Sequence, residues 1–120
     1  MKEYGVILGG LIKSDKVIYN QMPRPWIINN ILKTIQRLDE FKFEYEVFQQ
    51  CCFQIITAPG IVESLVDTIK KTFEDRDFSV YIEYGTGEIE YLGDTIGTSY
   101  GPVLTQVGRS FDDNYKSLPH

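Results

Sequence analysis

Carboxylate side chains gather in the last third of the chain. Residues 74–113 hold nine Asp and Glu against two Arg, a local charge of −7 within a chain whose net charge is −5. Clustered carboxylates can hold a divalent metal, act as a general acid and base, or attract a cationic protein. A field of this sign repels nucleic acid and anionic lipid. The pattern favours a basic protein as partner and disfavours direct binding to nucleic acid.

Tyrosines are interleaved with these carboxylates. A tyrosine ring offers contact area at low entropic cost, and a neighbouring acid adds partner selectivity. If residues 78–92 form a hairpin in which Tyr84 faces Ile89, Glu83 lies directly across from Glu90, and the two like charges repel. A cationic partner would relieve that repulsion, although acids that only keep the surface solvated are the competing interpretation. The candidate partner-binding residues are Glu83, Glu88, Glu90, Asp94, Tyr81 and Tyr91.

Other chemical groups are sparse. The only histidine is His120, the last residue, which leaves a folded core without a triad or a histidine metal site. Cys51 and Cys52 are neighbours that would point to opposite faces of a strand, and this favours structural thiols over a bridge or a redox pair. The glycine spacings fit no phosphate-binding motif. We therefore expect no catalytic residue, no metal and no cofactor.

Composition indicates one folded unit. The chain has 120 residues, of which 42% are hydrophobic and 13% aromatic, enough to build one core. No stretch approaches the ~20 apolar residues that span a bilayer, and residues 1–4 do not resemble a signal peptide. We expect a cytoplasmic protein without membrane contact. Residues 1–109 would form a single α+β domain, followed by a polar, mobile tail over residues 110–120.

The first half of the chain predicts strands on either side of a helix. Residues 4–12 are almost continuously apolar, as in a strand buried on both faces, and residues 16–20 could return as a short strand. Apolar side chains at helical spacing follow Pro25 and predict a helix that ends near residue 39. Residues 41–47 alternate and residues 51–57 are apolar. They form either a hairpin that reverses at Gln49 and Gln50 or one long bulged strand.

The second half predicts a further helix and hairpin. The helix begins at Pro59 and carries an apolar stripe that ends at Phe73. Residues 78–84 and 89–92 alternate around a turn at residues 85–88, which predicts a hairpin. Beyond it, residues 103–107 could add an edge strand to a glycine-rich segment.

The order strand, helix, two strands, helix, strand predicts an α+β fold of the ferredoxin-like, split βαβ type. Such a fold has one antiparallel sheet with two helices on one face, and here an extra C-terminal hairpin or strand. This fold hosts enzymes, sensors, nucleic-acid binders and inhibitors, so it leaves function open.

In its size, acidity and lack of motifs the chain resembles bacterial toxin-immunity proteins and phage-encoded anti-defence inhibitors, including the anti-CRISPR kind. The resemblance implies a small inhibitor without enzymatic activity that blocks a basic, nucleic-acid-processing protein by presenting its acids as a nucleic-acid mimic. An alternative is a ligand-binding module that closes the loop of residues 93–108 over a small molecule and oligomerises, for example as a homodimer. A third is an enzyme that uses Glu83, Glu90 or Asp94 with a metal.

Overall fold

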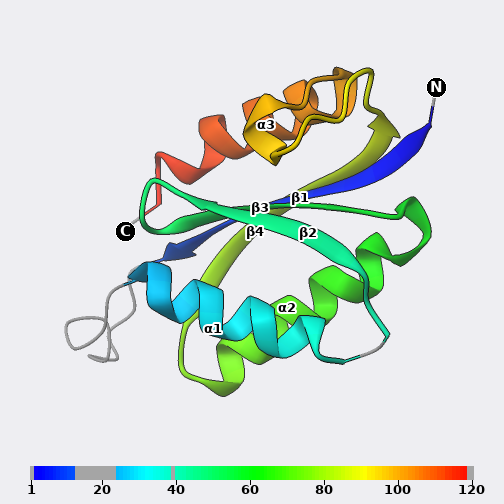
Figure 1. Ribbon diagram of the computed structural model, residues 1–120. Coiled ribbons are helices and arrows are strands. Elements are labelled where there is room, and N and C mark those ends of the chain that lie inside the picture. Colours follow the sequence, from blue (N-terminus) through cyan, green and yellow to red (C-terminus); the bar gives the residue numbers. More distant parts are fainter. Residues whose placement is uncertain (1, 13–23, 39, 119–120) are drawn as a thin grey trace.

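The chain forms a four-stranded antiparallel sheet with helices on both of its faces (Figure 1). A computed structural model describes residues 2–12, 24–38 and 40–118. The strands are β1 (Glu3–Ile12), β2 (Phe43–Phe48), β3 (Cys52–Thr57) and β4 (Ser79–Glu88), and the α-helices are α1 (Arg24–Gln36), α2 (Val62–Asp75) and α3 (Pro102–Tyr115). Two short 3₁₀ helices, η2 (Pro59–Ile61) and η3 (Ile96–Thr98), complete the described elements. The α+β prediction is confirmed, and the return strand expected at residues 16–20 lies outside the described residues.

Strand β1 lies inside the sheet, whose order is β2-β3-β1-β4. Both of its neighbours, β3 and β4, are antiparallel to it. Seven consecutive residues of β1 are buried, as the continuous apolar run predicted. Strands β2 and β3 form a hairpin rather than one bulged strand. The reversal occurs at Gln49 and Gln50, which adopt positive φ angles of 51° and 65° without help from glycine.

Helices α1 and α2 cover one face of the sheet, below it in Figure 1. Both begin near a proline, which suits the first turn of a helix because its missing N–H has no partner there. Their apolar stripes supply most of the main core, and Phe53 of β3 stacks on Phe73 of α2 with ring centroids 5.9 Å apart. This part of the fold follows from the helical and strand periodicities of the sequence.

The hairpin predicted over residues 78–92 is wrong, because β4 continues to Glu88 and pairs with β1 along its whole length. Gly85 lies opposite Val6 and Gly87 lies opposite Tyr4, so these glycines belong to the strand. A Cβ atom on Gly87 would come within 3.0 Å of the Cβ of Val103, and one on Gly85 within 3.1 Å of a Val107 methyl group. The glycines therefore let α3 approach β4 closely. Glycine thus serves here to allow close packing of a helix on a strand, and not to form a turn.

The extra C-terminal strand expected at residues 103–107 is also wrong, because residues 102–115 form α3, which includes the first residues of the expected polar tail. Pro102 occupies the first turn, and Val103, Val107, Phe111 and Tyr115 follow at intervals of four and are buried. They form a second core on the other face of the sheet, above it in Figure 1. Among the described residues, no helix is long and apolar enough to cross a membrane.

Candidate functional site

Two of the predicted partner-binding residues, Glu83 and Tyr81, lie against α3. The Tyr81 hydroxyl donates a hydrogen bond to Glu83 Oε1, and Asn114 Nδ2 of α3 donates to the same oxygen at 3.3 Å. The Tyr81 ring packs 5.9 Å from that of Phe111. Burial and the bond to Glu83 raise the pKa of Tyr81 to about 12. These two side chains therefore fasten the third helix to β4.

The predicted pairing of Glu83 with Glu90 does not form. Glu83 lies opposite Leu8 of β1, and Glu90 lies beyond the end of β4, where its backbone N–H donates to the Tyr100 carbonyl at 3.0 Å. The register instead sets Glu88 opposite Glu3 of β1. Both of these side chains are exposed, and like charges directly opposite each other repel. Two acidic residues thus do face each other across neighbouring strands, but they are Glu3 and Glu88 rather than Glu83 and Glu90.

Tyr91 and Tyr100 form an exposed aromatic pair at an isolated antiparallel β-bridge. Their backbones are joined by hydrogen bonds of 3.1 Å and 2.9 Å, and their rings stack with centroids 5.4 Å apart. Tyr91 is 51% exposed, Tyr100 59% and the adjacent Leu92 52%. Monomeric proteins seldom leave large apolar side chains grouped in the open without a use for them.

Three carboxylates belong to the same region of the chain. Glu88, Glu90 and Asp94 are exposed, and within residues 2–12, 24–38 and 40–118 none of their carboxylates has an ion-pair or hydrogen-bond partner. Their charge is therefore left for an external cation. We call the group made by these residues and the exposed aromatic pair the tip surface: Glu88, Glu90, Tyr91, Leu92, Asp94 and Tyr100.

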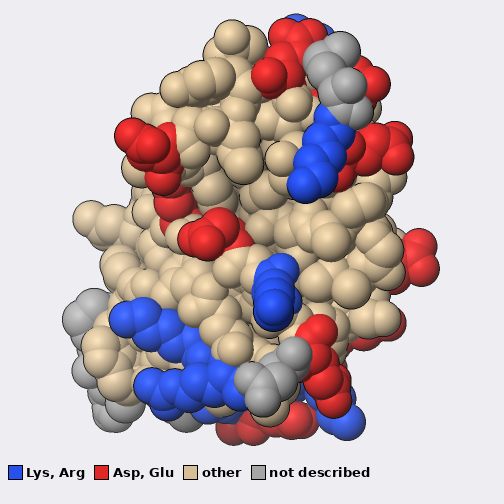
Figure 2. Space-filling view, turned by 45° about the vertical axis from the view of Figure 1, so that its right-hand side comes forward, with Lys and Arg blue, Asp and Glu red and all other residues tan. Residues whose placement is uncertain are grey.

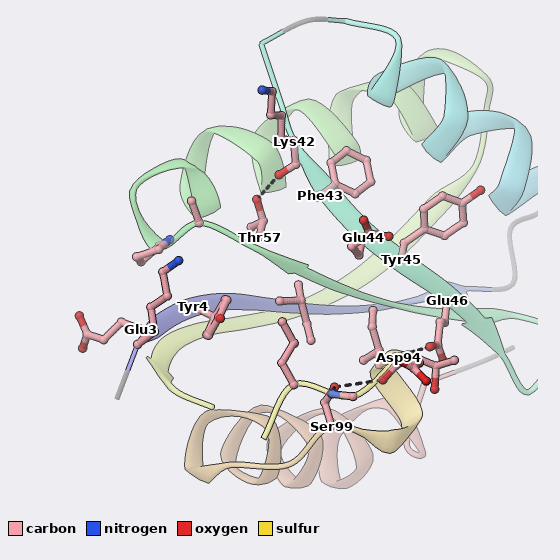
Figure 3. A pocket seen from close by; sticks show the side chains of 18 residues that line it. Glu3, Tyr4, Lys42, Phe43, Glu44, Tyr45, Glu46, Thr57, Asp94 and Ser99 are labelled. Carbon is pink, nitrogen blue, oxygen red and sulfur yellow. Dashed lines mark hydrogen bonds between the residues drawn. The ribbon is translucent and has the colours of Figure 1, made fainter. Parts of the chain in front are cut away.

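A groove of about 800 Å³ opens between this region and β2 (Figure 3). Leu92 and Asp94 line it from the loop of residues 92–99, and Glu44 lines it from β2. The loop is anchored by Glu46, whose Oε1 accepts hydrogen bonds from the backbone N–H groups of Ile96 and, at 3.4 Å, Gly97. This carboxylate caps the start of η3 and fixes the wall of the groove.

The remaining acids of residues 74–113 are dispersed. Glu74 and Asp75 end α2, Asp77 lies in the turn between α2 and β4, and Asp112 and Asp113 lie on α3. Figure 2 shows acidic and basic side chains together on one face. The segment charge of −7 is therefore divided among several parts of the surface, and only one part coincides with the exposed aromatic pair.

The two cysteines are free thiols whose sulfur atoms lie 3.9 Å apart. Burial raises the pKa of Cys52 to about 12, so this thiol stays protonated at neutral pH and is a poor nucleophile. The Tyr115 hydroxyl donates to the Leu11 carbonyl at 2.6 Å and lies 3.6 Å from Cys51 Sγ. Among the described residues, no three His, Cys, Asp or Glu side chains converge on a point that could hold a metal ion.

Sequence reasoning missed several members of this region. It named Glu88, Glu90, Asp94 and Tyr91 and placed Tyr100 in the same acidic region, but it did not predict that Tyr100 stacks on Tyr91 or that acids of β2 lie beside the groove. Gly101 was the one residue of the sequence that could have indicated a close approach of the two segments that carry Tyr91 and Tyr100. A Cβ atom there would come within 2.6 Å of the Ile89 Cα, so the glycine permits the close crossing of two chain segments. Comparison with protein-family models and with curated proteins finds no match for the chain.

Proposed function

We propose that the protein is a small inhibitor that binds a basic, nucleic-acid-processing protein through the tip surface, as toxin-immunity and phage anti-defence proteins do. The observation that carries the proposal is the exposed Tyr91–Tyr100 stack beside three carboxylates that have no partner among the described residues. Rigid aromatic side chains supply most of the binding energy in many interfaces, and peripheral charges supply selectivity and association rate. On this proposal the protein acts in the cytoplasm and without catalysis.

The carboxylates favour a partner with basic side chains. Glu88 and Glu3 face each other across neighbouring strands, with Glu90 and Asp94 further along the chain. Holding these charges near one another raises the free energy of the unbound protein, and arginine or lysine side chains of a partner would lower it. A surface of this kind competes with a phosphate backbone for the same basic site.

We also propose that the fold is ferredoxin-like, with α3 as an addition. The support is the strand order: β3 lies between β1 and β2, and β1 lies between β3 and β4. Each of the two β-α-β units therefore has a strand of the other unit inserted into it, with α1 and α2 on the same face.

The test is capture of a partner by three versions of the protein in extract from the native host. One version carries Glu88→Lys, Glu90→Lys and Asp94→Lys, and a matched control carries Glu74→Lys, Asp75→Lys and Asp113→Lys. The control changes the net charge equally at acids near the C-terminal ends of α2 and α3, where lysine is favourable. We expect the wild type and the control to capture the same basic protein and the tip variant to lose it. Added duplex DNA should displace that protein.

The proposal fails if the tip variant and the control capture the same proteins, or if every captured protein is acidic. Circular dichroism of all three versions checks that a loss of capture does not reflect unfolding.

The groove favours a second candidate function, that of a ligand-binding module able to oligomerise. The volume of the groove, about 800 Å³, lies within the range of small-molecule sites, and the loop of residues 92–99 forms one wall. A thermal-shift screen with metabolites distinguishes the two candidates, because a small ligand raises the unfolding temperature by mass action. An inhibitor would be stabilised only by its protein target.

A further inference from the structure

Strand β2 presents an open backbone edge beside the groove. It pairs with β3 and, among the described residues, has no strand on its other side. The Phe43 carbonyl accepts a hydrogen bond from Gln36 Nε2 of α1 at 2.9 Å, so it points away from β3. In an antiparallel strand the N–H and C=O of one residue point to the same side, and that side alternates along the strand. The backbone groups of Tyr45 and Val47 therefore also point to the open edge.

Strand β2 carries few of the features that protect natural strand edges from pairing. Its sequence, FEYEVF, contains neither lysine nor proline. Its pairing with β3 is continuous from Phe43 to Phe48, without a bulge. Edges that are not meant to pair usually have such features, or are covered by another element. The geometry of β2 therefore suits the addition of a further strand.

The two faces of β2 specify the chemistry of the added strand. On the face toward α1 and α2, Phe43 is buried and Tyr45 and Val47 are half-buried. On the groove face Glu44 is exposed, and Asp94 lines the same groove from the loop (Figure 3). Lys2 and Lys42 also line the groove, so a basic side chain of the added strand fits only opposite Glu44 and toward Asp94. Because side chains of a strand alternate between faces, a strand added here matches best when basic residues alternate with apolar ones.

We infer that β2 binds an extended segment of a basic partner protein as an additional antiparallel strand, and that basic side chains of this segment lie opposite Glu44 on the groove face. The inference rests on the proposed function and describes how that partner is held. The tip surface and the groove share Leu92 and Asp94, so one partner can contact both.

A second copy of the chain fits this edge less well. Antiparallel pairing of two β2 strands through the backbones of Tyr45 and Val47 would set Glu46 close to an acidic residue of the other copy. Like charges at such positions destabilise a strand pair.

The test uses a short capped peptide in which Arg alternates with Val, added to the whole protein and followed by NMR amide hydrogen exchange. We expect slower exchange of the Tyr45 and Val47 amide protons, because these N–H groups would donate hydrogen bonds to carbonyls of the added strand. Two control peptides separate strand pairing from simple attraction. One has the same composition with the Arg and Val residues in separate blocks, and the other has Glu in place of Arg.

Two variants locate the site. Val47→Pro removes an outward N–H and is tolerated where an edge faces solvent, and Glu44→Lys reverses the charge on the groove face. Each should weaken binding of the alternating peptide at least about tenfold, whereas Glu63→Lys on α2 should leave it unchanged. If Val47→Pro fails to fold, Glu44→Lys carries the test, because its side chain is exposed.

Several results would overturn the inference. The block peptide could bind as tightly as the alternating one, or Glu44→Lys could leave binding unchanged. The amides of Tyr45 and Val47 could already be protected in dilute free protein, or become protected as protein concentration rises, which would indicate a second copy. If partner capture depends on the tip carboxylates but not on Glu44 or Val47, the proposed function stands and this inference fails.

Discussion

Glu83 shows how one acidic side chain can serve the fold instead of a partner. Its carboxylate accepts hydrogen bonds from Tyr81 and from Asn114 of α3. From the sequence alone, its position between two tyrosines in an acidic segment was equally typical of a binding surface. The residues that engage it lie two and 31 positions away, and the longer separation is invisible to local patterns.

The raised pKa of Tyr81 predicts a specific loss of stability in alkali. A tyrosine in the unfolded chain has a pKa of 10.0 and Tyr81 in the folded protein one of about 12, so the folded state holds the proton more tightly. This contribution is complete below pH 10 and is lost as the pH rises toward 12. Urea unfolding between pH 8 and pH 12 should show a smaller alkaline decrease in Tyr81→Phe than in the wild type. Equal decreases in both proteins would contradict this explanation.

Gly101 predicts a second effect at the scale of one residue. A Cβ atom there would meet the backbone of Ile89, Glu88 and Glu90 at 2.6–2.8 Å, and backbone cannot move aside as a flexible side chain can. We expect Gly101→Ala to lower the free energy of unfolding by about 1–3 kcal/mol and to disturb the Tyr91–Tyr100 stack.

Gly60→Ala is the matched control for this change. A Cβ atom at Gly60 meets no atom within 4 Å, so its effect should stay within about 0.5 kcal/mol. Urea unfolding measures both variants, and equal effects would show that the crossing is not tightly packed.

At the scale of elements, α3 determines how the second face of the sheet is covered. Its approach depends on Gly85 and Gly87 of β4, above which Val107 and Val103 pack. Gly87→Val would improve strand propensity yet force α3 outward, and we expect a net loss of about 1–3 kcal/mol.

Thr86→Val, at the exposed position next to it, provides the comparison. Threonine and valine have similar strand propensities, and this position does not face α3, so the effect should stay within about 0.5 kcal/mol. Denaturant unfolding of both variants tests the role assigned to the glycines. A Gly87→Val protein as stable as Thr86→Val would show that α3 does not need them.

The sequence allowed the correct prediction of α1, α2 and the central strands because their apolar residues follow one clear period. It failed where one residue type has two uses. Gly85 and Gly87 were interpreted as a turn, since glycine favours turns, but they lie inside β4 beneath a helix. The surrounding glycines were interpreted as evidence against a regular element, apart from a possible edge strand at residues 103–107. Val103, Val107 and Phe111 nevertheless fit the helical spacing that the structure shows.

At the scale of the molecule, the charge of −7 on residues 74–113 is a property of the sequence and not of one surface. In the folded chain the acids of this segment lie at the end of α2 and in the turn after it, on β4, in the loop beyond β4, and on α3. Net charge counts residues without regard to where the chain turns, which is why the predicted acidic surface was too large. Four of its six predicted members remain in the tip surface: Glu88, Glu90, Asp94 and Tyr91.

The affinity of the captured partner for two tyrosine variants tests directly whether the tip surface binds it. The first carries Tyr91→Ala and Tyr100→Ala, and the second carries Tyr84→Ala on β4, where another tyrosine is 45% exposed outside the tip surface. Calorimetric titration should show affinity reduced at least about thirtyfold for the first, as for the loss of an aromatic anchor, and unchanged for the second. Equal affinity of the wild type and the double variant would contradict the claim that this surface binds the partner.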